Sequence, residues 1–217
     1  TSLNLKSVRF YNPRNGIITG EGGFIARTSN RGLSWSIVNS GVSENLNSVS
    51  YSSAKRALAV GQSGRILKTT DGGKNWAKQQ STTNRRLKSI KMQKGTQRGW
   101  AVGERAMLMK TTDGGETWTE KTVSGETAED LNDVEFVDSQ TGVAVGNNGT
   151  VLKTTDGGET WEASNPVSAD LQAVDFVKES GESGGSGRSI AKMSADYSGG
   201  VVGADGNILA SEDSGGT

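Results

Sequence analysis

Short stretches in which apolar and polar residues alternate recur at regular distances along the chain. A Leu-x-x-Val/Ile-x-hydrophobic stretch appears 30 or 31 residues before each of four tryptophans. These stretches begin at Leu5, Leu46, Leu87 and Leu131. Alternation with a period of two residues predicts a β-strand with one buried face. In the fourth copy the stretches 142–146 and 150–155 follow, and a last strand is expected from Trp161. Each copy therefore predicts four short antiparallel strands.

Each copy ends in a Ser/Thr-x-Asp-x-Gly-x-x-Trp string, in which the first copy has Asn in place of Asp. The four tryptophans are 41, 42 and 43 residues apart, and a fifth string at 211–217 stops one residue before its expected Trp. The predicted structural residues of these turns are Asn30, Gly32, Trp35, Asp71, Gly73, Trp76, Asp113, Gly115, Trp118, Asp156, Gly158, Trp161, Asp213 and Gly215. Short Asp and Asn side chains accept hydrogen bonds from nearby backbone amides, and glycine adopts the unusual φ angles of a tight turn. Because an active site is needed only once, a motif in every copy favours a structural role over calcium binding or catalysis.

A single sheet of this size cannot bury both faces, so the copies must stack. A repeat of about 42 residues with four strands is typical of a β-propeller blade. We therefore predict an all-β propeller domain of about five four-stranded blades over residues 1–217, with a β-sandwich as the minor alternative. The expected blades are 3–40, 44–80, 85–122, 129–165 and 169–217.

The turn string matches the Asp-box (BNR) repeat. The longer pattern Val-Gly-x-x-Gly-x-x-Leu-Lys-Thr-Thr-Asp-Gly-Gly-x-x-Trp at 60–76 and 145–161 resembles photosystem II stability/assembly-factor-like propellers. The resemblance covers nearly the whole chain and implies a non-enzymatic assembly factor in the thylakoid lumen, the periplasm or a secreted setting. Members of that family usually have seven blades, so this sequence represents either a smaller ring or an incomplete chain.

The last copy departs from the pattern. A first strand is expected at 171–177, but its Val-Gly partner at 202–203 comes 17 residues late. The excess contains a linker-like stretch at 181–187 and a hexapeptide at 188–193 that resembles 88–92. Two interpretations remain open. One is a circular rearrangement or engineered closure in which the N-terminal segment completes the last blade, and the other is an ordinary loop insertion.

Composition limits the chemistry. The chain has 31 Gly but only 2 Pro, which favours many tight turns, and it has no Cys and no His. The absence of both residue types excludes disulfides, thiolate metal sites, classical catalytic triads and histidine-ligated zinc. We expect no cofactor and no metal. No apolar run approaches the length of a membrane-spanning helix.

Charge is segregated along the chain although the formal net charge is zero. Residues 1–53 carry +3, residues 54–110 carry +12 with only two acidic residues, and residues 111–217 carry −15. A basic segment of this kind attracts an acidic peptide, an anionic glycan or nucleic acid. Nucleic acid is the weakest option because aromatic residues are few in the segment, where Trp100 is the only one besides the box residue Trp76, and core packing is the more natural role of Trp100.

In a propeller, the loops that lead into each first strand and the turns between second and third strands open on the same face. This face is expected to carry five candidate partner-binding residues. They are Arg65, Arg85, Arg86, Lys88 and Arg105. Four other cations are expected on the opposite face with the Asp-box turns, namely Lys55, Arg56, Lys94 and Arg98. The alternative without a binding function is that all nine of these cations are ordinary solvated surface charges. The family resemblance implies an arginine-rich patch that engages photosystem polypeptides, which favours an acidic protein or peptide partner for a monomeric propeller.

The alternative function is a glycan-binding or sialidase-like glycoside hydrolase propeller, because Asp boxes also occur in those proteins. Such a site needs paired carboxylates, or a tyrosine nucleophile with an arginine cluster. Tyr11 and Tyr51 occupy equivalent repeat positions, which indicates architecture, and Tyr197 is the third tyrosine. Glu116 and Glu159 recur inside the boxes. No catalytic residues are therefore assigned.

Overall fold

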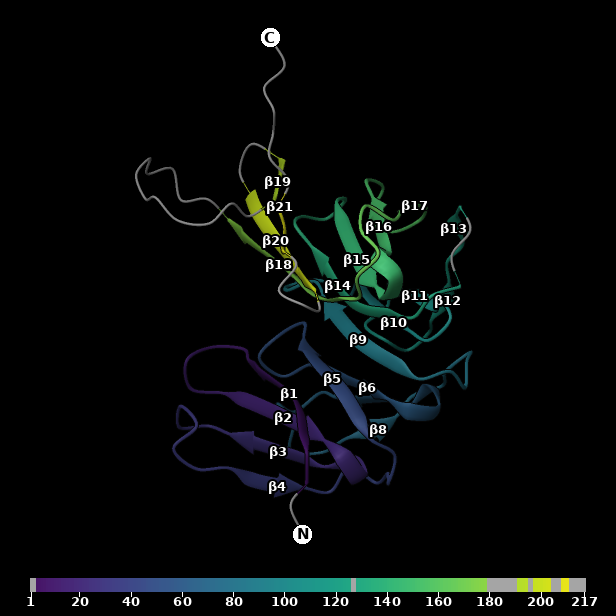
Figure 1. Ribbon diagram of the computed structural model, residues 1–217. Coiled ribbons are helices and arrows are strands. Elements are labelled where there is room, and N and C mark those ends of the chain that lie inside the picture. Colours follow the sequence, from purple (N-terminus) through teal and green to yellow (C-terminus); the bar gives the residue numbers. More distant parts are fainter. Residues whose placement is uncertain (1–2, 126–127, 179–190, 195–196, 204–207, 211–217) are drawn as a thin grey trace, which may run out of the picture. The chain divides into compact units, whose positions relative to one another are not determined.

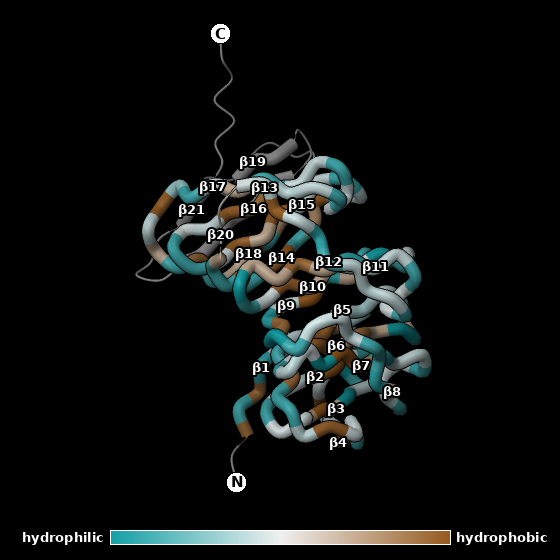
Figure 2. Tube along the Cα trace, turned by 90° about the vertical axis from the view of Figure 1, so that its right-hand side faces the viewer, coloured by the Kyte–Doolittle hydropathy of each residue, from teal (hydrophilic) through white to brown (hydrophobic). Residues whose placement is uncertain are grey.

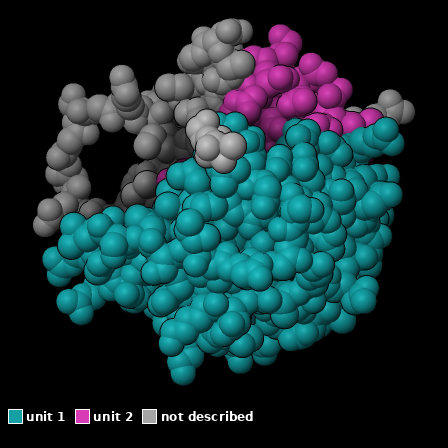
Figure 3. Space-filling view, turned by 90° about the horizontal axis from the view of Figure 1, so that it is seen from below, with its two compact units in different colours: residues 1–122 teal, residues 123–217 magenta. Residues whose placement is uncertain are grey.

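The computed structural model describes residues 3–125, 128–178, 191–194, 197–203 and 208–210 (Figure 1). Within these ranges the regular structure is β-strand with short 3-10 turns, and the strands form five separate sheets. The chain divides into two compact units, residues 1–122 and residues 123–217 (Figure 3). Unit 1 holds three sheets and unit 2 holds two, and each sheet is called a blade below.

Unit 1 consists of three four-stranded antiparallel blades in which neighbours in sequence are neighbours in the sheet. Blade 1 contains β1 (Leu5–Phe10), β2 (Gly16–Gly20), β3 (Ile25–Thr28) and β4 (Ser36–Val38). Blade 2 contains β5 (Leu46–Tyr51), β6 (Ala57–Gly61), β7 (Ile66–Thr69) and β8 (Ala77–Lys78). Blade 3 contains β9 (Leu87–Met92), β10 (Gly99–Gly103), β11 (Leu108–Thr111) and β12 (Thr119–Glu120). The predicted alternation at Leu5, Leu46 and Leu87 thus marks the first strand of each blade.

Unit 2 begins with a blade that has one strand more than the pattern predicts. Blade 4 contains β14 (Leu131–Phe136), β15 (Gly142–Gly146), β16 (Val151–Thr154) and β17 (Trp161–Ser164) in the same order as before. A fifth strand, β13 (Val123–Ser124), pairs in parallel with β17 at the outer edge, and the Ser124 hydroxyl donates to the Trp161 carbonyl over 2.9 Å.

Blade 5 shows which stretch near the end of the chain takes the place of the first strand. Strand β18 (Leu171–Lys178) pairs with β20 (Tyr197–Gly203) in the register of the other first strands, with Leu171 opposite Gly203 as Leu131 is opposite Gly146. Strands β19 (Ala191–Ser194) and β21 (Ile208–Ala210) also pair with β20. The stretch 171–177 therefore takes the first-strand place. The linker-like residues 181–187, the start of the hexapeptide at 188–190 and the fifth box with Asp213 and Gly215 lie outside the described residues.

The turns between second and third strands explain part of the glycine content. In η1 (Glu21–Gly23), η2 (Gln62–Gly64) and η3 (Asn147–Gly149), the middle residue has a left-handed φ of 64°, 55° and 50°, respectively. Gly64 also has a left-handed φ, and a Cβ there would overlap the carbonyl of Thr83. The η2 turn of blade 2 therefore packs tightly against the loop that leads into blade 3.

The apolar core lies between neighbouring blades. We call face A the side of each blade that carries the positions of Val49, Ala59 and Leu67 in blade 2, and face B the opposite side, which carries those of Leu58 and Val60. Face A of blade 2 packs with Ile17 and Ile25 on face B of blade 1. Face A of blade 3, with Ile90, Ala101 and Met109, packs with Leu58, Val60 and Ile66 on face B of blade 2. In unit 2, Leu171 and Val174 pack with Val143 and Val145 in the same sense.

Candidate functional site: the Asp-box turns and the basic loop face

The Asp-box turns are closed by the side chain of their aspartate. In blade 2 the Thr69 hydroxyl donates to Asp71 Oδ1 over 2.9 Å, and the backbone amides of Lys74 and Asn75 donate to the same oxygen, each over 3.0 Å. The Gly73 amide donates to the Thr69 hydroxyl over 2.9 Å. The same bonds recur around Asp113 and Asp156. The aspartate thus satisfies backbone donors that the turn would otherwise leave without an acceptor.

Blade 1 builds the same turn with a neutral side chain. Asn30 Oδ1 accepts from the Thr28 hydroxyl at 2.9 Å and from the Ser34 amide at 3.0 Å, while Asn30 Nδ2 donates to the Ser34 hydroxyl over 2.8 Å. Arg31 has a φ of 69° where the other boxes have glycine. A non-glycine residue in this left-handed region is strained, so this is the least favourable of the four turns.

The box carboxylates are held ionised. Hydrogen bonds from the backbone and side chain of Asn75 lower the pKa of Asp71 to about 2. For Asp113, partial desolvation opposes the shift, but hydrogen bonds from Thr117 prevail and lower the pKa to about 2. The side chain and backbone of Thr160 also lower the pKa of Asp156. Carboxyl groups that stay charged and engaged in this way are unsuited to donate a proton as a general acid.

The tryptophan side chains of the boxes are buried or half-buried and do not extend into solvent. Trp161 is fully buried and meets Phe136 edge-on with ring centroids 5.8 Å apart, and Trp118 is 5% exposed. Trp35 and Trp76 are half-buried. Trp100, in β10, is fully buried, in keeping with a core role.

The loops of unit 1 bring four of the five candidate cations into one neighbourhood. Arg65 follows η2, whose Gly64 packs on the loop containing Thr83 and Arg85. Arg85 Nη1 donates to the Arg105 carbonyl over 3.5 Å. Arg86 and Glu104 are joined by backbone and side-chain hydrogen bonds, including Glu104 N to Arg86 O at 3.0 Å. We call the residues Arg65, Arg85, Arg86 and Arg105 the basic loop face.

Lys88 is placed differently from the other four. It is the second residue of β9, at the repeat position of Asn47 in β5 and Asn132 in β14. Both asparagines donate through Nδ2 to the carbonyl of the next first-strand leucine, over 2.7 Å to Leu87 and 2.8 Å to Leu171. Lys88 therefore occupies a strand position that serves blade-to-blade contact in two other copies.

The basic loop face is partly neutralised by its own carboxylates. Arg65 pairs with Glu44, Arg86 Nε lies 3.0 Å from Glu104 Oε1, and Arg85 Nη1 lies 4.0 Å from Glu120 Oε1. The guanidinium of Arg65 lowers the pKa of Glu44 through a hydrogen bond. Sequence reasoning missed these acids, although Glu44 and Glu104 stand in the same classes of loop as the arginines.

The four cations assigned to the opposite face lie in loops between first and second strands. The Gly72 amide of the box turn donates to the Lys55 carbonyl over 2.8 Å, so this loop and the box turn adjoin. Lys55 and Arg56 are exposed. Lys94 Nζ lies 4.7 Å from the ring centroid of Tyr11. Arg98 is exposed in the corresponding loop of blade 3.

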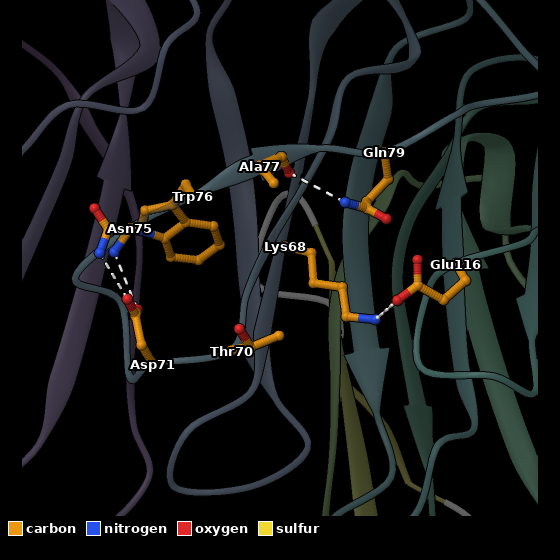
Figure 4. Close-up of a pocket in the computed structure, with 8 residues that line it drawn as sticks. All are labelled: Lys68, Thr70, Asp71, Asn75, Trp76, Ala77, Gln79 and Glu116. Atoms are coloured by element: carbon orange, nitrogen blue, oxygen red, sulfur yellow. Dashed lines mark hydrogen bonds and ion pairs between the residues drawn. The ribbon is translucent and has the colours of Figure 1, made fainter.

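A shallow hollow of about 310 Å³ lies beside the outer strand of blade 2 (Figure 4). Lys68 and Glu116 point toward one another there, with Nζ and Oε1 2.5 Å apart, next to Trp76. Asp71 and Asn75 line the same hollow but are bonded to each other within the box turn. The cation and the carboxylate are therefore engaged with one another, and sequence reasoning had not paired them.

The tyrosines form part of the architecture of unit 1. The rings of Tyr11 and Tyr51 lie 5.8 Å apart, and burial raises the pKa of Tyr51 to about 12, although the nearby Arg27 opposes the shift. A phenol with a raised pKa is a poor nucleophile at neutral pH. Glu116 and Glu159 are exposed in box turns, and nothing is described of the Tyr197 side chain.

Within the described ranges, no group of three or more His, Cys, Asp or Glu residues is placed to hold a metal ion. The described part of the chain also has no helix long and apolar enough to cross a membrane.

Comparison with solved structures defines the class of fold. A structure of YCF48 bound to D1 peptide aligns with a TM-score of 0.64 and 19% identity over 97% of this chain and 70% of that chain. YCF48 from Cyanidioschyzon merolae aligns with a TM-score of 0.64 and 22% identity over 93% and 67%. An ancestral GH74 enzyme aligns with a TM-score of 0.61 and 20% identity over 73% of this chain but 23% of that chain. No curated protein sequence matches. The chain is a β-propeller protein of the Asp-box type, as its sequence predicts.

The family follows from the sequence match. The profile of the photosynthesis system II assembly factor YCF48 matches residues 27–126 and 120–187, which together span most of the chain. The chain belongs to this family, and the resemblance inferred from the repeat pattern is confirmed.

Proposed function

We propose that the chain is a non-catalytic scaffold that acts in photosystem II assembly by binding an acidic segment of another polypeptide through the basic loop face. The observation that carries the proposal is that Arg65, Arg85, Arg86 and Arg105 lie on adjoining loops, with Arg85 bonded to the Arg105 carbonyl. Membership of an assembly-factor family supports binding rather than catalysis. That a YCF48 protein was solved with a D1 peptide supports a peptide as the class of ligand.

The intramolecular ion pairs determine how such a ligand would bind. Arg65 and Arg86 are already paired with Glu44 and Glu104, so an acidic ligand must compete with these carboxylates. Arg85 is 40% exposed and its acidic neighbour Glu120 is 4.0 Å away, at the limit of an ion pair. Arg105 is exposed at the tip of its turn. Arg85 and Arg105 are therefore the best first contacts for a carboxylate.

The test uses a fluorescently labelled peptide of alternating Glu and Ala, with a Lys/Ala peptide of equal length as the control ligand. The Arg85→Glu/Arg105→Glu variant is expected to bind the acidic peptide about fivefold to tenfold more weakly, because two exposed charges change sign. The matched control Lys55→Glu/Arg56→Glu makes the same change in net charge near the box turns and should bind nearly as the parent does. Binding should weaken as salt rises, since the Debye length falls from about 30 Å at 0.01 M to about 3 Å at 1 M.

Two outcomes contradict the proposal. Equal weakening by both double variants would mean that only net charge matters, and no weakening by either would place the site elsewhere. Catalysis has a separate test: sialosides and aryl glycosides should show no turnover above buffer, and hydrolysis abolished by one carboxylate or tyrosine substitution would favour the glycosidase alternative.

A further inference from the structure

The outer edge of blade 4 carries a short strand from an earlier part of the chain. Strand β13 pairs in parallel with β17, with Val123 opposite Trp161 and Ser124 opposite Glu162. The Ser124 hydroxyl donates to the Trp161 carbonyl over 2.9 Å. The outer strand of this repeat can therefore accept a fifth strand in which an apolar residue is followed by one with a hydroxyl group.

The outer strand of blade 2 has the same repeat positions, but its described sheet ends at β8. Counted from the box tryptophans, residues 76–79 correspond to residues 161–164. The Gln79 amide donates to a carbonyl of β7 over 2.9 Å, so the backbone groups of Gln79 face β7. Successive residues of a paired strand direct their backbone groups to opposite sides. Lys78 and Trp76 therefore present theirs to the outer edge.

Two of these outward groups are open to a partner. Among the described residues, nothing donates to the Trp76 carbonyl, and the Lys78 amide has no acceptor. The Lys78 carbonyl is engaged by the Gln79 side chain, whose Nε2 donates to it over 3.2 Å. In a parallel ladder a residue bonds to the residues on either side of the one it opposes. A residue opposite Ala77, in the register of Ser124 on blade 4, would thus donate to Trp76 and accept from Lys78.

The hollow beside β8 leaves room for the side chain of that residue. Ala77 pairs with Lys68 and lies on face B, and both line the hollow of about 310 Å³ together with Glu116 (Figure 4). Thr70 and Gln79 add further polar groups to its wall. Ala77 is also smaller than its counterparts in the other blades, which are Ser36, Thr119 and Glu162. A polar side chain opposite Ala77 therefore fits the space and its chemistry.

The box tryptophans differ between the two edges. Trp161, opposite Val123 of β13, is fully buried, whereas Trp76 is half-buried. A β-branched apolar residue opposite Trp76 would remove more of its ring from water, which is favourable. The edge of blade 2 thus favours the same order of residues that β13 has.

The whole site is built by unit 1. Face A of blade 2 packs on blade 1 and face B packs on blade 3, and all residues that line the hollow lie between positions 68 and 116. In Figure 2 the hydrophobic colouring of blade 2 lies on β6 and β7, and the chain around β8 is mostly hydrophilic. Ala77 and Lys78 are exposed. The core of this blade is complete without β8, whose edge offers backbone groups rather than an apolar surface.

We propose that the outer edge of β8 binds a short extended segment of another polypeptide as a parallel fifth strand. The segment has a β-branched apolar residue opposite Trp76, followed by a serine or threonine opposite Ala77. Strand addition of this kind takes affinity from main-chain hydrogen bonds and selectivity from alternate side chains. The seat of β13 on blade 4 identifies the occupant, and the site uses no residue of the basic loop face.

The test traps the bound segment through a disulfide, because the chain has no cysteine of its own. In blade 4 a Cβ on Gly125 would lie 3.3 Å from that of Ala163, the counterpart of Lys78, and disulfides join Cβ atoms about 3.5–4.5 Å apart. The probe is the capped peptide Lys-Thr-Val-Ser-Cys, supplied as its mixed disulfide with glutathione. The thiolate of the Lys78→Cys variant attacks the peptide sulfur and releases glutathione.

Mass spectrometry at exchange equilibrium gives the fraction of protein that carries the peptide. Loading of Lys78→Cys is expected to exceed that of Lys55→Cys by about tenfold or more, because docking raises the effective concentration of the peptide thiol. Lys55 is exposed in a loop of the same unit and serves as the control for an accessible thiol. Ala163→Cys is the matched control on an edge that β13 already occupies, and it should load no more than Lys55→Cys.

A second peptide tests the strand pairing itself. Lys-Thr-Val-Pro-Cys lacks the amide that would donate to the Trp76 carbonyl, so its loading should not distinguish Lys78→Cys from Lys55→Cys. In the parent chain, millimolar Lys-Thr-Val-Ser-Gly should shift the NMR signals of the Ala77 and Lys78 amides, whereas Lys-Thr-Val-Pro-Gly should not.

Three results would overturn the proposal. Equal loading of Lys78→Cys and Lys55→Cys by the serine peptide, with no amide shifts in the parent, would mean that this edge has no site. Equal loading of Lys78→Cys by the serine and proline peptides would mean that the contact is not a strand pair. Loading of Ala163→Cys to the level of Lys78→Cys would mean that trapping does not depend on an open edge.

Discussion

Strands β1 and β5 carry the same alternation of apolar residues but lie in different surroundings. Leu46 and Val49 of β5 are fully buried against blade 1, whereas Leu5 and Val8 of β1 are 56% and 49% exposed. Both strands pair with their second strands in the same register, including the irregularity after the leucine. Backbone pairing alone thus forms the strand, and the neighbouring blade supplies the apolar contribution to stability.

The largest expected effect is on the free energy of unfolding, in which substitutions of Leu46 and Leu5 should differ. Leu46→Ala should lower the free energy of unfolding by about 2–5 kcal/mol, because it removes buried methyl groups and leaves a cavity. Leu5→Ala should change it by less than about 0.5 kcal/mol, as is usual for exposed sites. Urea titrations of the two variants measure both changes. A large loss of stability for Leu5→Ala would contradict the contrast between the two strands.

The Asp boxes extend the comparison to the turns. Asp71→Ala should lower the free energy of unfolding by about 1–3 kcal/mol, since it leaves backbone amides of the turn without their acceptor. Asn30→Ala should cost less, because Asn30 is exposed and neutral and its turn is already strained at Arg31. Thermal and urea unfolding of the two variants give the difference. If the folded fraction of Asp71→Ala lost peptide binding while its stability held, the turn would have a functional role.

Acid should weaken the aspartate boxes and leave the asparagine box unaffected. Asp71 and Asp113 have folded-state pKa values of about 2, below the ordinary value of 3.8. A depressed carboxyl pKa stabilises the folded state when the group is ionised, so this contribution is fully present above about pH 4 and is lost as pH falls toward 2. Melting temperatures measured across this window should fall less steeply for Asp71→Asn than for the parent. Identical slopes would contradict the assignment of the shift to Asp71.

Much of the fold follows from local sequence. The alternation beginning at Leu46, Leu87 and Leu131 coincides with the starts of β5, β9 and β14, and the strand expected from Trp161 is β17. These elements are predictable because strand period and turn chemistry depend on residues close in the chain. Strand β13 was not predicted, since only Val123 and Ser124 pair and two residues have no recognisable period.

The site is less predictable than the fold. The sequence placed Arg85 and Arg105 in two kinds of loop that open on the same face, but it did not reveal that Glu44 would pair with Arg65, 21 residues away. Nor did it separate Lys88, a strand residue, from the loop arginines. Val8 is 49% exposed and Val49 is fully buried, although both occupy the same position of the repeat. The local pattern is the same in both strands and does not predict this difference in exposure. Such properties arise from contacts between segments distant in sequence.

The smallest effect on stability is expected from removing Glu44, which competes with an acidic ligand for Arg65 of the basic loop face. This change should strengthen binding, whereas the arginine reversals should weaken it. Glu44→Gln should change the free energy of unfolding by less than about 1 kcal/mol, because the ion pair with Arg65 is partly exposed. It should nevertheless strengthen binding of the acidic peptide by about twofold to fivefold, since the Arg65 guanidinium becomes available to the ligand and the local field becomes more positive. The matched control is Glu116→Gln, which makes the same charge change in a box turn and releases Lys68 from its own ion pair. Anisotropy titrations at low and high salt compare the two. A gain confined to Glu44→Gln and abolished at high salt supports the basic loop face, whereas an equal gain in Glu116→Gln would show that the peptide responds only to net charge.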